Sequence, residues 1–303
     1  MALDPAAVID RRRLKRRLNF WRIAAVVAVA AGLFAGVTRY EDAGFSDHVA
    51  RLEVSGIILD DPARQEALRE AVKRDSVKAL IVAIDSPGGT FVGGEALFEQ
   101  LRDVAAEKPV IAVLGGTATS AAYMAAIGTD HILARKGTVT GSIGVIMQTA
   151  DITGLLEKLG IKPETVKSGP LKAQPNPMEP FSLAAREATR AVISDLFGQF
   201  VDMVATRRGL DRSVVLGLAD GRVYSGRQAL DAGLVDAIGG ETAARRWLAA
   251  QHGIAESLPV QPLEVEDDEE AWRQLMDSMI GKTLFSERLR LDGVLSVWQP
   301  ELN

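Results

Sequence analysis

Short apolar runs alternate with amphipathic stretches from about residue 49 onward. Uninterrupted apolar runs predict buried strands, whereas apolar residues recurring every three or four positions predict helices. The alternation of these segments predicts an α/β domain with parallel strand pairing. The expected strands are Val49–Val54, Ala79–Ile84, Val110–Leu114, His131–Ala134, Gly144–Met147 and Thr165–Lys167. The expected helices are Pro62–Arg74, Thr90–Ala106, Ser120–Ile127 and a long helix that Ser182 caps and that runs to Arg208, where Gly209 ends it.

A long uncharged segment, Ile23–Thr38, lies near the start of the chain behind a basic head. As a helix its sixteen residues would span roughly 24 Å, somewhat less than a membrane core of about 30 Å. We expect residues 1–22 to be a cytoplasmic head and residues 23–38 a transmembrane anchor, which places the chain from Glu41 onward on the opposite side of the membrane. A cleaved signal peptide and an ordinary buried helix are the alternatives.

Composition and charge narrow the class of protein. The chain has 47% hydrophobic residues and no Cys, which indicates a globular protein and excludes disulfide and cysteine-zinc scaffolds. Residues 1–22 carry seven basic and two acidic side chains, so 28 basic and 38 acidic side chains remain for the rest. An acidic body with 5% aromatic residues gives no support for binding nucleic acid.

The segment that follows the expected anchor, residues 39–255, is predicted to form one domain. Residues 256–303 are predicted to be a C-terminal extension with an acidic linker, Glu264–Glu270. A proline-rich loop interrupts the domain, because four of its prolines lie within eleven residues: Pro170, Pro175, Pro177 and Pro180. Such a loop cannot be helical, but it can be stiff.

Two junctions between a strand and a helix carry candidate chemistry. The first is Asp85-Ser86-Pro87-Gly88-Gly89-Thr90, where backbone amides at a strand end can bind a developing oxyanion or simply form a tight turn. The second is Gly115-Gly116-Thr117-Ala118-Thr119-Ser120, which places a serine at a helix N-terminus. Ser120 is either an N-cap or a nucleophile, and a nucleophile needs a group that removes its proton.

Histidine and lysine are the candidate bases. The chain has three histidines, and His48, His131 and His252 are each expected at a surface or a strand end, so a Ser-His-Asp triad is poorly supported. A lysine can serve when its amine is neutral, which requires a site that lowers its pKa from the ordinary value of about 10.4. Lys172, at the mouth of the proline-rich loop, is rigidly held on sequence grounds; otherwise it is a surface lysine.

Four short segments together resemble the signal peptide peptidase A family in its short form, the bacterial serine peptidases of family S49 that use a Ser-Lys dyad. The likeness covers roughly residues 49–250, and the apolar segment before it also resembles that of the family. The matching segments are Ser86-Pro87-Gly88-Gly89, Thr119-Ser120-Ala121-Ala122-Tyr123, Thr138-Val139-Thr140-Gly141-Ser142-Ile143-Gly144-Val145 and Ser168-Gly169-Pro170-Leu171-Lys172. By analogy the fold is expected to be similar to the crotonase and Clp-peptidase superfamily, a spiral of strand-strand-helix units.

The resemblance assigns roles to particular residues. Ser120 matches the nucleophile, Lys172 the general base, and Ser142 a serine that orients the lysine amine. The amides of Gly88 or Gly89 and of Ala121 match the oxyanion hole, and no cofactor or metal is implied. Where the family often has glycines after the nucleophile, this chain has Ala121-Ala122, and where an acidic residue often follows the lysine, it has Ala173.

The resemblance also implies a function. It predicts a serine endopeptidase in the bacterial inner membrane, with its catalytic domain on the periplasmic side, that degrades remnant signal peptides as a homo-oligomer. In similar short forms the serine and the lysine of one site come from neighbouring protomers. Two alternatives from other classes are a crotonase-like acyl-CoA hydratase or isomerase, which would need carboxylates at the site and no anchor, and a non-catalytic membrane scaffold.

Overall fold

A computed structural model of the chain describes residues 46–265 and 295–297, together with Trp21, Ala25, Val27 and Val29. The chain divides into two compact units, Met1–Asp47 and His48–Asn303. In the first unit Trp21, Ala25, Val27 and Val29 are helical and exposed. Among the described residues, no helix combines the length and the apolar character that a membrane crossing requires. The predicted anchor, residues 23–38, lies outside the described residues except at three of those positions.

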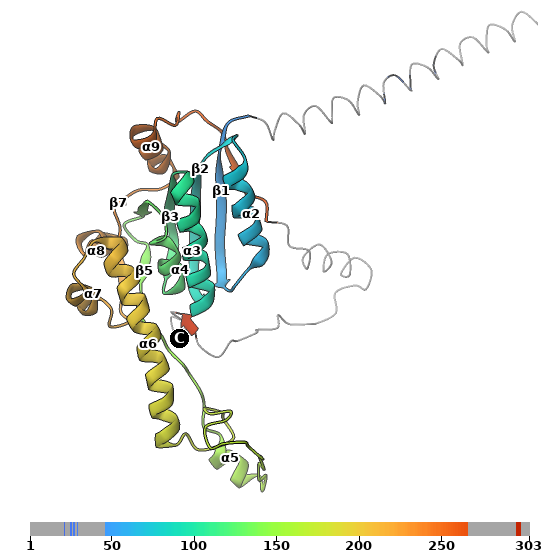
Figure 1. Cartoon of the computed structure of the whole chain (residues 1–303), viewed down its shortest axis with the longest axis vertical. Helices are drawn as coiled ribbons and strands as arrows, with labels where there is room; N and C mark the ends of the chain where they lie inside the picture. The colour runs from blue at the N-terminus through green and yellow to red at the C-terminus, as the bar shows by residue number, and fades with distance from the viewer. Residues whose placement is uncertain are drawn as a thin grey trace, which may run out of the picture. The chain divides into compact units, whose positions relative to one another are not determined.

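The second unit contains strands and helices in alternation, as predicted (Figure 1). The strands are β1 (His48–Ile58), β2 (Val77–Thr90), β3 (Val110–Thr119), β4 (His131–Ala134), β5 (Val139–Gly141), β6 (Val223–Ser225), β7 (Ala237–Ile238), β8 (Val260–Pro262) and β9 (Leu295–Val297). The helices are α2 (Pro62–Lys73), α3 (Phe91–Glu107), α4 (Ala121–Ala126), α5 (Thr153–Lys158), α6 (Leu183–Arg208), α7 (Arg212–Leu218), α8 (Gly226–Asp231) and α9 (Glu241–His252).

The strands form one branched sheet whose main path is β6-β5-β3-β2-β1-β8. β1, β2, β3 and β4 pair in parallel, which puts their carboxyl ends at one edge of the sheet. β3 divides between two partners, since residues 111–114 pair with β4 and residues 117–119 pair with β5. This division carries the end of β3, and the serine that follows it, away from β4.

Both faces of the sheet are covered, which explains why the central strands are apolar on both sides. One face packs against α3, α4 and α6 in a core that includes Leu80, Val82, Leu97 and Phe200. The other face, with Ala79 and Ile81, packs against α9. Burying an aliphatic side chain of this size stabilises the fold by about 1.5–3 kcal/mol, so the two buried faces of β2 contribute strongly to stability.

Most of the predicted elements are confirmed, with three differences. β2 and β3 run past their predicted ends through the Pro-Gly-Gly and Gly-Gly segments. The strand predicted at Gly144–Met147 is wrong, since the paired residues are Val139–Gly141. The strand predicted at Thr165–Lys167 is also wrong, because this exposed segment pairs with no strand of the part of the chain that the structure describes. The spiral arrangement expected from the resemblance stays a prediction.

The segment from residue 146 to residue 192, here called the arm, differs from the rest of the unit. It contains α5, the proline-rich loop and the first part of α6, and Figure 1 shows it extending from the sheet. Ala185 is the one buried residue among residues 146–192, all of which are described. The long helix of the arm has the predicted ends: the Ser182 hydroxyl accepts a hydrogen bond from the amide of Ala185, and Gly209 closes the helix with φ 62°.

Candidate active site

Ser120 lies between β3 and α4 in a strained backbone conformation. Its φ is 56° and its ψ is −119°, a region that residues with a side chain rarely adopt and that costs of order 1–3 kcal/mol. The hydroxyl makes no capping hydrogen bond to α4, so the interpretation of Ser120 as a simple N-cap is wrong. Such strain persists where surrounding contacts hold it, and it is common among catalytic nucleophiles at strand-to-helix turns.

β5 provides the contacts that hold Ser120. The Ser120 amide donates to the carbonyl of Gly141 at 2.8 Å, and Thr119 pairs with Gly141 across the two strands. The buried Thr140 hydroxyl donates to the Ala118 carbonyl at 2.6 Å, which fixes β5 against β3. This pairing brings Ser142, predicted to orient the lysine, beside Ser120. Ser142 is 8% exposed, and its φ of 50° makes it a second strained serine at the same edge.

The Pro-Gly-Gly segment lies on the opposite side of Ser120. The Thr119 hydroxyl donates to the Pro87 carbonyl at 2.9 Å, so this segment and the nucleophile candidate are fixed together. The Gly88 amide donates to the Ser86 hydroxyl at 3.1 Å, and that hydroxyl donates to the Gly56 carbonyl at 2.6 Å. In this conformation the Gly88 amide is therefore already hydrogen-bonded to Ser86. Its role in an oxyanion hole stays a prediction.

Two glycines explain why small residues are required around Ser120. A Cβ added to Gly89 would lie 1.8 Å from the carbonyl oxygen of Ile58, so only glycine permits β1 and β2 to approach so closely. A Cβ added to Gly94 in α3 would lie 2.8 Å from the Cβ of Ala121, where α3 crosses the start of α4. Gly89 and Ala121 thus both lie at the edge where Ser120 lies, as the predicted oxyanion hole requires.

Tyr123 anchors the helix that follows Ser120. Its ring is fully buried, its hydroxyl donates to the Leu234 carbonyl at 2.8 Å, and burial raises the pKa of the phenol well above its ordinary value. A neutral, hydrogen-bonded tyrosine in the core fixes α4 against the segment before β7. The residue therefore has a structural role in holding Ser120 in place.

Lys172 lies in a different part of the second unit from Ser120. The described residues of the second unit outside the arm are here called the body. Lys172 belongs to the arm and is exposed, whereas Ser120 belongs to the body and is 1% exposed. Its amide donates to the Gly169 carbonyl at 3.1 Å, and Ala173, with φ 61°, follows it in a tight turn. The structure thus places five of the six predicted site residues at one edge of the sheet and the sixth, Lys172, on the arm.

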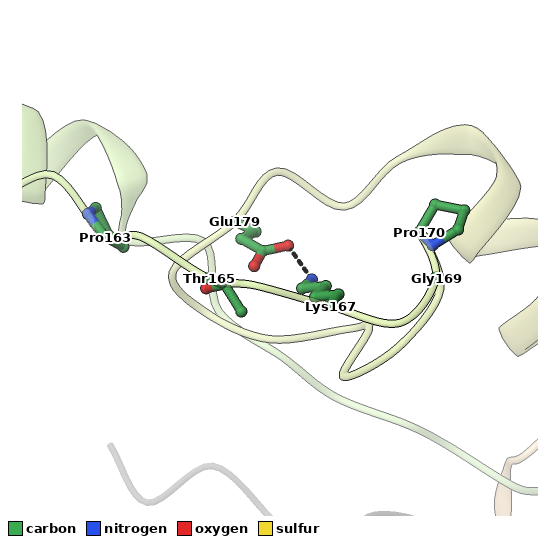
Figure 2. Close-up of a pocket in the computed structure, with 6 residues that line it drawn as sticks. All are labelled: Pro163, Thr165, Lys167, Gly169, Pro170 and Glu179. Carbon is green, nitrogen blue, oxygen red and sulfur yellow. Dashed lines mark hydrogen bonds and ion pairs between the residues drawn. The ribbon is translucent and has the colours of Figure 1, made fainter.

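The loop that carries Lys172 lines an open cavity of about 600 Å³, and polar contacts join the two sides of the loop (Figure 2). Glu179 forms an ion pair with Lys167 and accepts a hydrogen bond from the side-chain amide of Gln174 at 2.7 Å. The hydrogen bond from Lys167 and a further one from Gln174 outweigh burial and lower the pKa of Glu179. Sequence reasoning missed Glu179, although a carboxylate seven residues after Lys172 was visible in the proline-rich loop.

The histidines lie at the opposite ends of the strands. His131 begins β4 and pairs with Ile111 near the start of β3, so at about 3.3 Å per residue it is roughly 20 Å or more from Ser120. It stacks on Trp247 at 4.8 Å between ring centroids, and burial lowers its pKa. His48 begins β1 and His252 ends α9. The prediction that none of the three serves Ser120 agrees with these positions.

A further strand lies on the edge of β2 beside the site. β9 pairs with β2 in antiparallel register, with Val297 opposite Gly88 and Leu295 opposite Thr90. β1 occupies the other side of the same residues, since Ile57 pairs with Gly88. The edge of β2 at Gly88–Thr90 therefore accepts an extended chain through its backbone, and β9 occupies it here.

The described ranges 46–265 and 295–297 contain no cluster of side chains suited to bind a metal ion. No group of three or more His, Cys, Asp or Glu side chains there is arranged to hold an ion. The polar groups around Ser120 are instead hydroxyls and backbone amides. An arrangement of this kind suits attack by a hydroxyl on a carbonyl group, followed by stabilisation of an oxyanion.

Comparison with known proteins agrees with this chemistry. The model of peptidase family S49 matches residues 102–255, half of the chain. A Synechocystis sp. protein named as a protease is 38% identical over 208 residues, which are 68% of this chain and 75% of that protein. An Enterococcus faecium protein named as a signal peptide peptidase SppA is 33% identical over 213 residues, 66% of this chain and 62% of that protein. Serine protease SPPA, chloroplastic, of Arabidopsis thaliana is 33% identical over 179 residues, 58% of this chain and 26% of that protein.

A solved structure shares the fold. It is a serine-to-alanine mutant of the 1510-N membrane-bound stomatin-specific protease, with a TM-score of 0.50 and 14% identity, and the match covers 73% of this chain and 99% of that one. Fold and site together define a serine peptidase of mixed α/β architecture. The chain belongs to peptidase family S49. This membership favours a peptidase over the acyl-CoA hydratase or isomerase and the scaffold.

Proposed function

We propose that this peptidase is a membrane-anchored endopeptidase with a Ser120–Lys172 dyad. The observation that carries the proposal is the strained backbone of Ser120 at the point where β3, β5 and the Pro-Gly-Gly segment meet. A hydroxyl held in this way is fixed toward a substrate, which removes part of the entropic cost of attack. The missing base is then Lys172, the lysine of the Ser-Gly-Pro-Leu-Lys segment.

The reaction follows from the chemistry of these groups. The Ser120 Oγ attacks the carbonyl carbon of the scissile peptide bond while the neutral amine of Lys172 accepts the hydroxyl proton. The amides of Gly88 or Gly89 and of Ala121 stabilise the tetrahedral oxyanion. Lys172 then protonates the departing amine, and the acyl group remains on Ser120 as an ester. A water molecule, deprotonated by Lys172, hydrolyses this ester, and Ser142 orients the lysine amine in both steps.

The active form is proposed to be a homo-oligomer in which Ser120 of one protomer meets Lys172 of a neighbour. Two observations support this arrangement. The arm that carries Lys172 extends from the body of the unit, where Ser120 is buried (Figure 1). The arm also exposes large apolar side chains, which water solvates poorly and a neighbouring protomer would cover. These residues are Ile146, Leu155, Leu159, Ile161, Val166, Leu171, Met178, Leu183 and Val192.

Remnant signal peptides are the proposed substrates, and the bacterial inner membrane is the proposed location. A relative from Enterococcus faecium carries the name of a signal peptide peptidase, which supports this substrate class. The backbone edge of β2 at Gly88–Thr90, where β9 pairs, suits an extended apolar peptide. The basic head and residues 23–38 support an anchor with the peptidase domain on the periplasmic side.

An acylating peptide inhibitor tests the dyad. Mass spectrometry of the full chain after treatment should locate one adduct on Ser120, and both Ser120→Ala and Lys172→Ala should abolish hydrolysis of a peptide substrate. A matched control is Lys162→Ala, which removes another exposed lysine of the arm and should keep near wild-type rates. An adduct on another side chain, or near wild-type activity of either dyad variant, would show that the proposed dyad is wrong.

A further inference from the structure

Glu179 joins the two limbs of the loop that carries Lys172. One limb, residues 163–167, leads toward the lysine, and the other, residues 174–179, leads away from it (Figure 2). The Glu179 carboxylate forms an ion pair with Lys167 on the first limb. It also accepts a hydrogen bond from the side-chain amide of Gln174 on its own limb. The Thr165 side chain contributes another hydrogen bond to the same carboxylate. One side chain therefore crosses the base of the loop.

The turn between these limbs is held by short-range contacts, including a hydrogen bond from the Asn176 side-chain amide to the Ala173 carbonyl at 2.8 Å. The Lys172 amide donates to the Gly169 carbonyl at 3.1 Å, and the Gln174 amide donates to the Leu171 carbonyl at 3.2 Å. Ala173 between them has φ 61°, a left-handed conformation that costs an alanine roughly 1 kcal/mol. No strand pairing supports residues 163–179 within the described part of the chain. A turn of this kind needs a crosslink at its base to keep one conformation.

The ion pair at the base is better placed than an ordinary surface pair. The Lys167 side chain is 14% exposed and that of Glu179 is 26% exposed. Removal of the carboxylate would leave Lys167, whose side chain is largely buried, without its partner and would release the side-chain amide of Gln174. The two limbs would then separate more freely, and the Lys172 amine would sample a wider range of positions.

We propose that Glu179 is a positioning residue for Lys172, acting by closing the loop at its base. This inference rests on the proposed function, since it requires Lys172 to be the general base. Its consequence is catalytic because proton transfer depends on geometry, and a displacement of about 1 Å costs roughly 10²-fold in rate. Glu179 itself touches neither the substrate nor Ser120 in this account.

The test compares Glu179→Ala with Glu164→Ala in the full chain. Glu164 is an exposed carboxylate on the first limb, so its variant removes the same charge without opening the base of the loop. We expect Glu179→Ala to lower kcat roughly 10- to 100-fold with little change in KM, and to move the acid limb of the kcat profile to higher pH, because a loose, hydrated amine is harder to deprotonate. Glu164→Ala should leave kcat and its pH profile unchanged.

Two further variants separate positioning from loss of fold. Glu179→Gln keeps the shape and one acceptor, so its rate should lie between those of the wild type and Glu179→Ala. The exchanged pair, Lys167→Glu with Glu179→Lys, should recover at least half of the lost rate if the crosslink matters. Glu179 variants that match Glu164→Ala, while Lys172→Ala is inactive, would overturn this inference and leave the dyad intact. An active Lys172→Ala would instead overturn the dyad.

Discussion

The body of the second unit and the arm present opposite solutions to holding a catalytic group. Ser120 in the body is buried, its amide is hydrogen-bonded to Gly141, and its strain is supported by a packed core. Lys172 in the arm is exposed, and its loop is held by a few hydrogen bonds and by the polar crosslink at Glu179. The difference teaches that packing and strand pairing fix the proposed nucleophile, whereas the proposed base lies on an exposed arm, where a neighbouring protomer would complete its surroundings.

The largest effect is expected from a charge on the apolar surface of the arm. Leu159, which is 64% exposed after α5, changed to Glu should weaken assembly, because an interface leucine contributes about 2 kcal/mol or more. Such a loss raises the dissociation constant of the assembly roughly 30-fold, so activity should fall steeply at protein concentrations near the assembly midpoint. The measurement is activity and mass by light scattering across a dilution series.

The control for this charge lies in the body. Val214 in α7 is 48% exposed, and Val214→Glu should leave assembly and activity unchanged. Equal effects of the two substitutions would remove the distinction between the arm and the body. Full activity of Leu159→Glu at every dilution would show that the arm does not bind a neighbour.

A second, smaller effect is expected at the strand that supports Ser120. Gly141 has φ 83°, and an added Cβ would lie 2.6 Å from the Tyr224 ring, so Gly141→Ala should lower the free energy of unfolding by about 2–4 kcal/mol. The remaining folded protein should react more slowly with an acylating inhibitor. Gly137→Ala, where a Cβ meets nothing within 4 Å, is the matched control for unfolding by urea.

A third prediction concerns the amino ends of the strands, far from Ser120. Burial alone would raise the pKa of Asp236, but two hydrogen bonds from Arg208 and one from the Ile132 amide hold this pKa below its ordinary value. We expect Asp236→Asn to lower the free energy of unfolding by about 2 kcal/mol at pH 7 without changing kcat.

The pH dependence of this variant has a definite sign. Because the folded pKa of Asp236 is lowered, its contribution is complete above the unfolded pKa of about 3.9 and is lost as pH falls through the folded value. The difference in unfolding free energy between wild type and Asp236→Asn should therefore shrink below about pH 4. A loss of kcat as large as that of Ser120→Ala would connect the two ends of the sheet and contradict the account.

The smallest effect is expected at the edge of β2. If substrates pair there, they must displace β9, so Ser296→Pro, which disturbs the pairing of β9, should lower KM by a few-fold at unchanged kcat. Asp268→Pro, in the acidic segment between β8 and β9, is the control for a proline elsewhere in the extension. An unchanged KM would argue that substrates bind elsewhere.

Sequence patterns predicted the order of the elements well, because the buried strands and the capped helices carry local signals. Ser182 and Gly209 marked the ends of α6, and the apolar run Ala79–Ile84 marked the centre of β2. The position of β5 could not be predicted from apolar content. Gly141 lies opposite Thr119 in the sheet, whereas the more apolar segment that follows makes a single bridge at Ile146 and forms no strand.

Some features of the candidate site could be predicted from the sequence and others could not. Strand pairing and the Thr119 contact with Pro87 place Ser120, Ser142, Gly88, Gly89 and Ala121 at one edge of the sheet, and their roles stay predictions. Strain at Ser120 and the crosslink at Glu179 have no sequence signature, because both depend on contacts between distant residues or across a loop. Lys172 is identified by its motif alone, because it lies on the exposed arm.

Mixed assembly of two inactive variants tests the central claim most directly, namely that Ser120 and Lys172 meet between protomers. Full-length Ser120→Ala and Lys172→Ala chains would be coexpressed in equal amounts, purified as one complex and assayed on a peptide substrate. If each site takes its serine from one protomer and its lysine from the next, about a quarter of the sites are intact and about a quarter of wild-type activity returns. A complex that contains both variants and stays inactive would contradict the account.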